Sequence, residues 1–130
     1  MPALDTNILV RYLVRDDEAQ FIKVLDLFAD HREVGLIINL PVIIETAWVL
    51  RGTYNYSKQE LIKTFRQLIN TEGLIVQSDK IIQKALDEYE RSNADFEDCL
   101  IAAHNTSTNS SPTFTFDKKA SKLKGMKLLK

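Results

Sequence analysis

Short apolar segments alternate along this chain with longer stretches of helical periodicity, and this alternation limits the folds open to it. The short segments are bounded by turn formers or acids and are too short for helices, which predicts strands. They are residues 1–4, 34–40, 74–76, 113–116 and 126–129. Between them, apolar residues recur every three or four positions, which predicts helices. Because strands that alternate with helices form parallel pairs, we predict an α/β fold with a mostly parallel sheet and helices on both of its faces.

Length and composition fit one domain that covers residues 1–130. Hydrophobic residues make up 45% of the 130 residues, which is enough for a core of ordinary size. No apolar run approaches the ~18 to 20 residues of a membrane span, and no secretory signal is visible. The single cysteine, Cys99, excludes an internal disulfide and fits a reducing compartment. We therefore expect a protein of a reducing compartment with no membrane attachment.

Five acidic residues stand where ligands collect in folds of this kind. Asp5 follows the first predicted strand and Asp117 follows the fourth, and ligands bind at the carboxyl ends of parallel strands. Asp95 and Asp98 are three apart, so they share one face at the start of a predicted helix. The fifth acid is Glu45. We predict that the fold brings these carboxylates together.

Each acid also has a structural alternative. Asp5 and Asp95 each precede a predicted helix and could serve as its N-cap, although Thr6 or Asn7 could cap the first helix as well. Asp117 begins a turn, where aspartate is common. Any one of these acids alone is better explained by structure than by function, and only their joint placement favours a site.

Glu45 lies within the apolar segment 42–50, so its helix is expected to bury it among apolar side chains. A buried carboxylate without a partner is costly, and it tends to neutralise or to find a counter-charge. The alternatives are an ion pair with Arg51, six residues on and poorly spaced for it, or a partly exposed strip of the helix. We predict that Glu45 faces a metal ion or a polar cleft.

Carboxylates without histidine or thiol partners favour Mg²⁺ or Mn²⁺ as the bound ion. The chain has only two histidines and one cysteine, which disfavours a tetrahedral zinc site. Hard divalent ions held by carboxylates activate water and stabilise charge on phosphate, so the expected chemistry is phosphodiester hydrolysis. No phosphate-binding loop of the G-x-x-x-x-G-K-[ST] type and no G-x-S-x-G motif is present.

Four blocks in order along the chain make it resemble the PIN-domain nucleases and, within them, the VapC-type toxins of toxin–antitoxin pairs. The blocks are LDTNILVRYL (4–13), ETAWVL (45–50), DFEDCLIAAH (95–104) and TFD (115–117). The resemblance implies a three-layer α/β/α sandwich with a mostly parallel five-stranded sheet. It implies a Mg²⁺- or Mn²⁺-dependent endoribonuclease, a cognate antitoxin that blocks its cleft, and a homodimer.

The resemblance also implies roles for residues at the matching positions. Asp5, Glu45 and Asp98 are the core metal-binding and catalytic acids, with Asp117 as the fourth. Asp95 is an additional metal-binding acid, and which of Asp95 and Asp98 lies nearer the metal stays open. The residues implied as polar support for the site are Thr6, Asn7 and Thr115.

Basic side chains could hold the RNA backbone through phosphate contacts. The candidates are Arg11 and Arg15, four apart on one helix, and Lys118 and Lys119. The two lysines begin a C-terminal segment, 118–130, with six lysines and no acid. For each of these residues the alternative is an ordinary solvated charge.

Two other functions are compatible with parts of the pattern. One is a catalytically inactive module that binds RNA or an antitoxin-like protein without cleavage. The other is a small-molecule phosphohydrolase with Asp5 as an aspartyl nucleophile, as in the haloacid-dehalogenase enzymes. Those enzymes need a second acid two residues later, where this chain has Asn7, so the phosphohydrolase is disfavoured.

Overall fold

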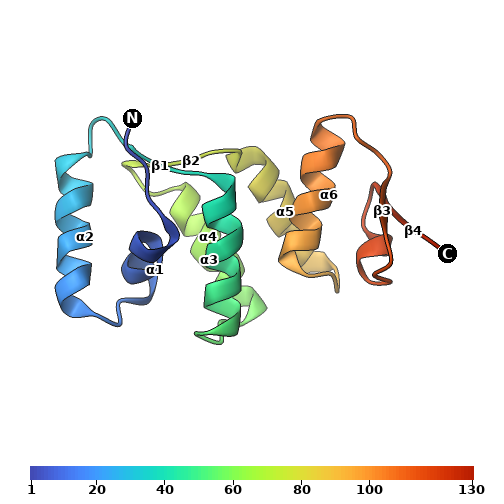
Figure 1. Cartoon of the computed structure of the whole chain (residues 1–130), viewed down its shortest axis with the longest axis horizontal. Coiled ribbons are helices and arrows are strands. Elements are labelled where there is room, and N and C mark those ends of the chain that lie inside the picture. The colour runs from blue at the N-terminus through green and yellow to red at the C-terminus, as the bar shows by residue number, and fades with distance from the viewer. The chain divides into compact units, whose positions relative to one another are not determined.

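The computed structural model describes all 130 residues, which divide into two compact units, Met1–Ser78 and Asp79–Lys130. Figure 1 follows the chain from one terminus to the other. The first unit contains α1 (Thr6–Val14), α2 (Glu18–Asp30), β1 (Leu36–Ile38), α3 (Leu40–Gly52), α4 (Lys58–Ile69) and β2 (Leu74–Val76). The second contains α5 (Asp79–Arg91), α6 (Phe96–Ser107), β3 (Thr113–Thr115), the 3₁₀ turn η1 (Ala120–Lys122) and β4 (Met126–Leu128). None of the helices has the length and apolar character that crossing a membrane requires.

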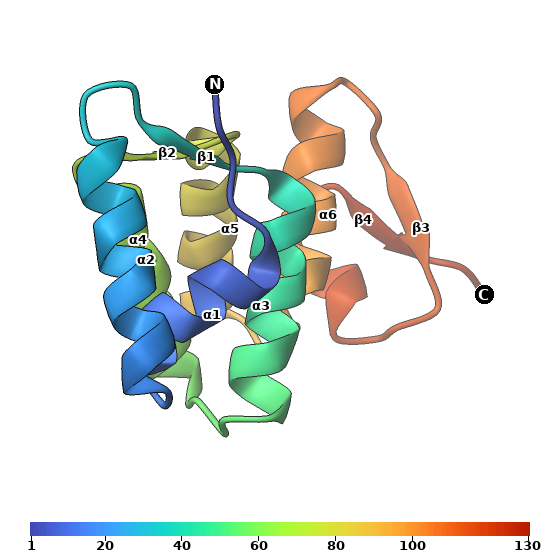
Figure 2. The same cartoon turned by 60° about the vertical axis from the view of Figure 1, so that its left-hand side comes forward.

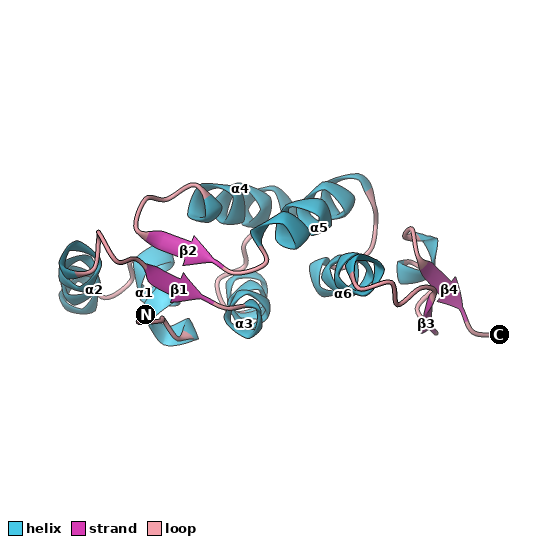
Figure 3. Cartoon of the chain, turned by 90° about the horizontal axis from the view of Figure 1, so that it is seen from above, coloured by secondary structure: helices cyan, strands magenta, loops and turns pink.

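The sheet of the first unit consists of β1 and β2, which pair in parallel with Leu36 opposite Leu74. The predicted strand 74–76 is confirmed, but the predicted strand 34–40 is shorter in the structure. It ends early because the Asn39 side chain accepts a hydrogen bond from the Val42 N–H at 3.0 Å and so caps α3. Figure 3 shows the two strands side by side in magenta.

The first predicted strand, 1–4, is reduced to a single bridge between Ala3 and Ile37. The Leu4 N–H donates to the Ile37 carbonyl and the Ile37 N–H donates to the Pro2 carbonyl, both at 2.9 Å. Pairing stops there because the next residue, Asp5, already caps α1. The segment thus has the parallel direction expected of it, without the length of a strand.

The predicted five-stranded sheet is therefore wrong in its extent. The structure has four strands in two small sheets, β1–β2 and β3–β4, and both pairs are parallel. The expectation of an α/β fold with parallel strands is confirmed. Strand pairing depends on partners distant in the sequence, which the local pattern of apolar residues does not specify.

Helices form most of the core of the first unit. α1 contacts both α2 and α3, and α4 packs against β2. Figure 2 shows α1 beside α3, turned toward the viewer. The side chains that fill the interior are apolar and almost fully buried: Leu9, Ile38, Ile43, Leu50, Leu61 and Phe65.

A capping box begins α4, as the sequence Ser57-Lys58-Gln59-Glu60 predicts. The Ser57 hydroxyl accepts from the Glu60 N–H at 3.1 Å, and the Glu60 carboxylate accepts from the Ser57 N–H at 2.9 Å. We expect Ser57→Ala to lower the free energy of unfolding by about 1 kcal/mol, measured by chemical denaturation. Ser57→Asp, which keeps a capping oxygen, is the control and should retain most of that stability. Equal midpoints for Ser57→Ala and the natural protein would contradict the expectation.

The second unit is built on the pair α5 and α6, which lie side by side (Figures 1 and 2). The rings of Tyr89 and Phe96 meet edge to face at the end of this pair, 5.7 Å between centroids. The predicted turn and strand that follow Asp117 are confirmed as η1 and β4. The sequence also predicts that Ser78, directly before α5, is the N-cap of this helix. That prediction is wrong, because Ser78 has φ +60° instead of the extended backbone of a capping residue.

Candidate metal-binding acids

Asp5 is the N-cap of α1, with extended backbone at φ −93° and ψ 177°. Its Oδ1 accepts a hydrogen bond from the Ile8 N–H at 3.1 Å, and the residue is exposed. The structural alternative for this acid is thus real, since it is Asp5 and not Thr6 or Asn7 that caps the helix. The cap fixes the direction of the carboxylate and occupies only one of its two oxygens.

Glu45 is exposed on α3, so the prediction that it is buried among apolar residues is wrong. It lies on an outward strip of the helix with Pro41 and Trp48, and the Trp48 side chain is 59% exposed. The outward strip is itself largely apolar, so the sequence of α3 does not distinguish its exposed side from its buried one. The Arg51 guanidinium donates to the Tyr56 carbonyl at 2.7 Å and is not paired with Glu45.

Asp95 and Asp98 both lie at the start of α6. Asp95 is the N-cap by position, but its side chain makes no capping hydrogen bond, so helix capping does not occupy this carboxylate. Asp98 is half-buried in the first turn. Burial raises the pKa of the Asp98 carboxyl above its ordinary value, and the negative charges of Asp117, Glu97 and Asp95 raise it further.

Asp117 follows β3 and begins the turn that leads to η1. Its Oδ1 accepts from the Ala120 N–H at 2.9 Å, and its own N–H donates to the Thr115 hydroxyl at 3.0 Å. Thr115 therefore holds the backbone of Asp117 in place. The two other residues named as polar support, Thr6 and Asn7, lie in the first turn of α1, half-buried and exposed respectively.

The second unit places Asp98 within electrostatic reach of Asp95, Glu97 and Asp117. In the first unit, Asp5 caps α1 and Glu45 lies on α3, and these two helices are in contact. In neither unit are three or more acidic, histidine or cysteine side chains arranged to hold a metal ion. The donor set does fit a hard divalent cation in its chemistry, because it contains only carboxylate oxygens. A cation would also offset the mutual repulsion that raises the pKa of Asp98.

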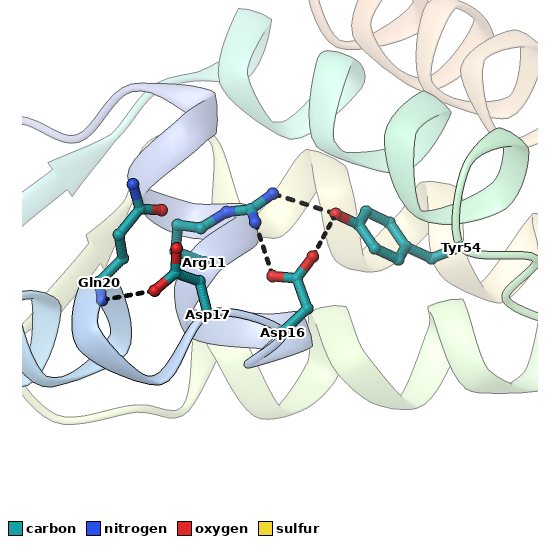
Figure 4. A network of polar contacts seen from close by, with 5 residues as sticks. All are labelled: Arg11, Asp16, Asp17, Gln20 and Tyr54. Atoms are coloured by element: carbon teal, nitrogen blue, oxygen red, sulfur yellow. Dashed lines mark hydrogen bonds and ion pairs between the residues drawn. The ribbon is translucent and has the colours of Figure 1, made fainter.

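The two candidate arginines have partners within the protein. Arg11 donates to Asp16 at 2.6 Å and to the Tyr54 hydroxyl at 3.0 Å, and Tyr54 donates to Asp16 at 2.9 Å (Figure 4). The Tyr54 hydrogen bond and the Asp16 charge raise the pKa of Arg11 above its ordinary value. Arg15 pairs with Glu18 at 2.9 Å. Contact of either arginine with RNA stays a prediction.

A hollow of about 500 Å³ in the second unit contains residues from two parts of the predicted site. Its lining residues are Asn93, Asp95, Phe116, Asp117, Lys118 and Lys119. Neither Phe116 nor Asn93 is among the site residues predicted from the sequence. The signal for Phe116 was available, because the alternation Thr-Phe-Thr-Phe over 113–116 places both phenylalanines on one face of an extended segment.

The fold and its acids define an α/β protein with a candidate site made of carboxylate oxygens alone. A profile of the PIN domain matches residues 3–126, and the chain belongs to this family. PIN domains are typically metal-dependent nucleases, so the class of enzyme is a hydrolase. The match runs through both units and includes all five predicted acids. No curated protein and no solved structure matches the chain significantly.

Proposed function

We propose that this protein is a Mg²⁺- or Mn²⁺-dependent endoribonuclease and the toxin of a type II toxin–antitoxin pair. The observation that carries the proposal is the Asp98 carboxylate, which is half-buried at the start of α6 and within electrostatic reach of three other acids. Burial and nearby negative charges make the charged form of the Asp98 carboxylate unfavourable, so this placement does not stabilise the fold. A function that needs the negative charge is the better explanation for the placement. The family match over residues 3–126 supports a nuclease as that function.

In this proposal Asp5, Glu45 and Asp98 hold the ion, with Asp117 as the fourth acid and Asp95 as an additional one. The ion would activate a water molecule and offset the charge that develops on the phosphate. The chain's own contribution is to fix the acids. The capping bond to Ile8 orients Asp5, and the Thr115 hydroxyl holds the backbone of Asp117.

RNA is the proposed substrate, and Lys118 and Lys119 are its proposed phosphate contacts, since both are exposed beside Asp117. A cognate antitoxin, a homodimeric assembly and a cytoplasmic site of action belong to the same proposal. They rest on the resemblance of the four sequence blocks to the VapC-type toxins.

A second candidate function is a module that binds RNA or a partner protein without cleaving RNA. Two observations favour it. Asp5 and Asp117 each use one carboxylate oxygen in a hydrogen bond from a backbone N–H, and in neither unit are three acids arranged as ligands of one ion. The presence of all five acids favours the nuclease.

Cleavage of total cellular RNA by the purified full-length chain tests the proposal. We expect discrete products with Mg²⁺ or Mn²⁺ and none with EDTA, because the ion supplies the activated water. Binding of the same RNA, measured in EDTA, shows whether an RNA that the protein leaves intact is nevertheless bound, and so separates the nuclease from the binding module. Bound but intact RNA at every Mg²⁺ and Mn²⁺ concentration would overturn the nuclease in favour of the binding module.

A further inference from the structure

Phe116 is exposed to an extent that folding does not explain. Its side chain is 78% exposed, and that of Phe114 on β3 is 61% exposed, whereas Thr113 and Thr115 are half-buried. Burial of a phenylalanine side chain stabilises a fold by about 1.5–3 kcal/mol. The hydrophobic effect would therefore favour buried phenylalanines and exposed threonines, which is the opposite of what this segment shows. Phe116 has the highest exposed fraction of the large apolar side chains and shares one face of the extended segment with Phe114, and an exposed apolar patch indicates contact with another molecule.

The surroundings of Phe116 indicate the chemistry of that molecule. Phe116 lines the 500 Å³ hollow, which has a volume in the ~300–1,000 Å³ range of small-ligand sites. Lys118 and Lys119 place two cations beside the ring, and Asn93 adds an amide. A nucleotide has a flat base that stacks on an aromatic ring, an anionic phosphate, and base edges that hydrogen-bond to amides.

The composition of the hollow argues against a protein partner at this position. Apart from Phe116, every residue that lines it is polar or charged. A docking site for an apolar side chain of another protein would need apolar neighbours around the ring. The lining contains two lysines and two acids, Asp95 and Asp117. The lysines match the negative charge of a nucleic-acid backbone, and the acids belong to the proposed metal site.

We propose that Phe116 stacks on an unpaired base of the RNA, next to the phosphate that is cleaved, and so positions the strand in the site. The proposal deepens the proposed nuclease function and rests on it for the identity of the nucleic acid. A base within an A-form helix has both faces covered by its neighbours and cannot stack on Phe116. Phe116 is a positioning residue here, and the acids remain the catalytic groups.

The test is the affinity of the full-length protein for a short single-stranded RNA and for a duplex of the same sequence. Both affinities are measured by fluorescence anisotropy in EDTA, where the RNA stays intact. We expect Phe116→Ala to weaken binding of the single strand roughly 5- to 150-fold, which corresponds to the loss of one stacked base. We expect the affinity for the duplex to stay unchanged and Phe116→Trp to keep the affinity for the single strand.

Phe114→Ala is the matched control, because this phenylalanine on β3 is also exposed, two residues before Phe116, but does not line the hollow. It should bind the single strand as the natural protein does. The proposal would be overturned if Phe116→Ala and the natural protein bound the single strand with equal affinity. It would also be overturned if Phe116→Ala lost as much affinity for the duplex as for the single strand, or if the substitution weakened only the binding of a protein partner.

Failure of this proposal and failure of the nuclease proposal are distinguishable. If the protein cleaves no RNA but its affinity for single-stranded RNA depends on Phe116, the stacking role stands and the nuclease proposal fails. Metal-dependent cleavage with no effect of Phe116→Ala on binding would do the reverse.

Discussion

Replacing Asp98 by asparagine is expected to abolish RNA cleavage and to make the protein more stable at neutral pH. Cleavage should fall by at least about 100-fold, since substitutions that only support a metal ligand already cost 10- to 100-fold. Stability should rise because burial and the charges of Asp117, Glu97 and Asp95 raise the pKa of Asp98 in the folded protein. Asparagine has nearly the same shape and carries no charge to desolvate or repel.

The pH dependence of the melting temperature checks the cause of this gain. A carboxyl whose pKa is raised by folding binds its proton more tightly in the folded state, so the natural protein loses stability as the pH rises above the ordinary value of 3.8. The advantage of Asp98→Asn should therefore be largest at neutral pH and should vanish below 3.8. Asp79→Asn, which alters an exposed first-turn acid of α5, is the control for both measurements. Lower stability of Asp98→Asn at neutral pH would contradict this explanation.

Asp5→Asn is expected to abolish cleavage while leaving the fold unchanged. The asparagine side-chain oxygen can accept the same hydrogen bond from the Ile8 N–H, and Asn and Asp are about equally good N-caps. The free energy of unfolding should therefore change by no more than about 0.5 kcal/mol. Only the negative charge is lost, and the charge is what an ion would need.

Asp17→Asn is a closely matched control for this substitution. Asp17 is the N-cap of α2 in the same unit, and its Oδ1 accepts from the Gln20 N–H at 3.0 Å. Figure 4 shows this contact. If Asp17→Asn cleaves RNA fully and Asp5→Asn does not, the loss of cleavage comes from the role of Asp5 in catalysis and not from its role as a helix cap. Full activity of Asp5→Asn with Mg²⁺ would remove Asp5 from the site and with it the proposed mechanism.

The helices could be predicted from the sequence because their signals are local. The capping box at Ser57 and the acid at Asp17 mark helix starts through hydrogen bonds that span only three residues. The extent of the sheet could not be predicted in the same way. Whether residues 1–4 form a strand or a single bridge depends on the position at which Asp5 begins α1.

The role of the candidate acids stays a prediction, and the sequence did not indicate their surroundings. Asp95 was expected to be a possible cap, and the structure leaves its carboxylate free of that role, whereas Asp5 makes the capping bond. The burial predicted for Glu45 failed because α3 carries apolar residues on its exposed strip too. Hydrophobic periodicity cannot assign the outer face of such a helix, since nearly every side of it is apolar.

Trp48 gives this chain an intrinsic reporter. It is the only tryptophan of the 130 residues, it is 59% exposed, and it lies three residues, about one helical turn, from Glu45. Its fluorescence emission therefore has a single origin and comes from the neighbourhood of one proposed acid. A titration with Mn²⁺ can be followed through this emission without a label and without any RNA, so occupancy of the site can be measured separately from turnover.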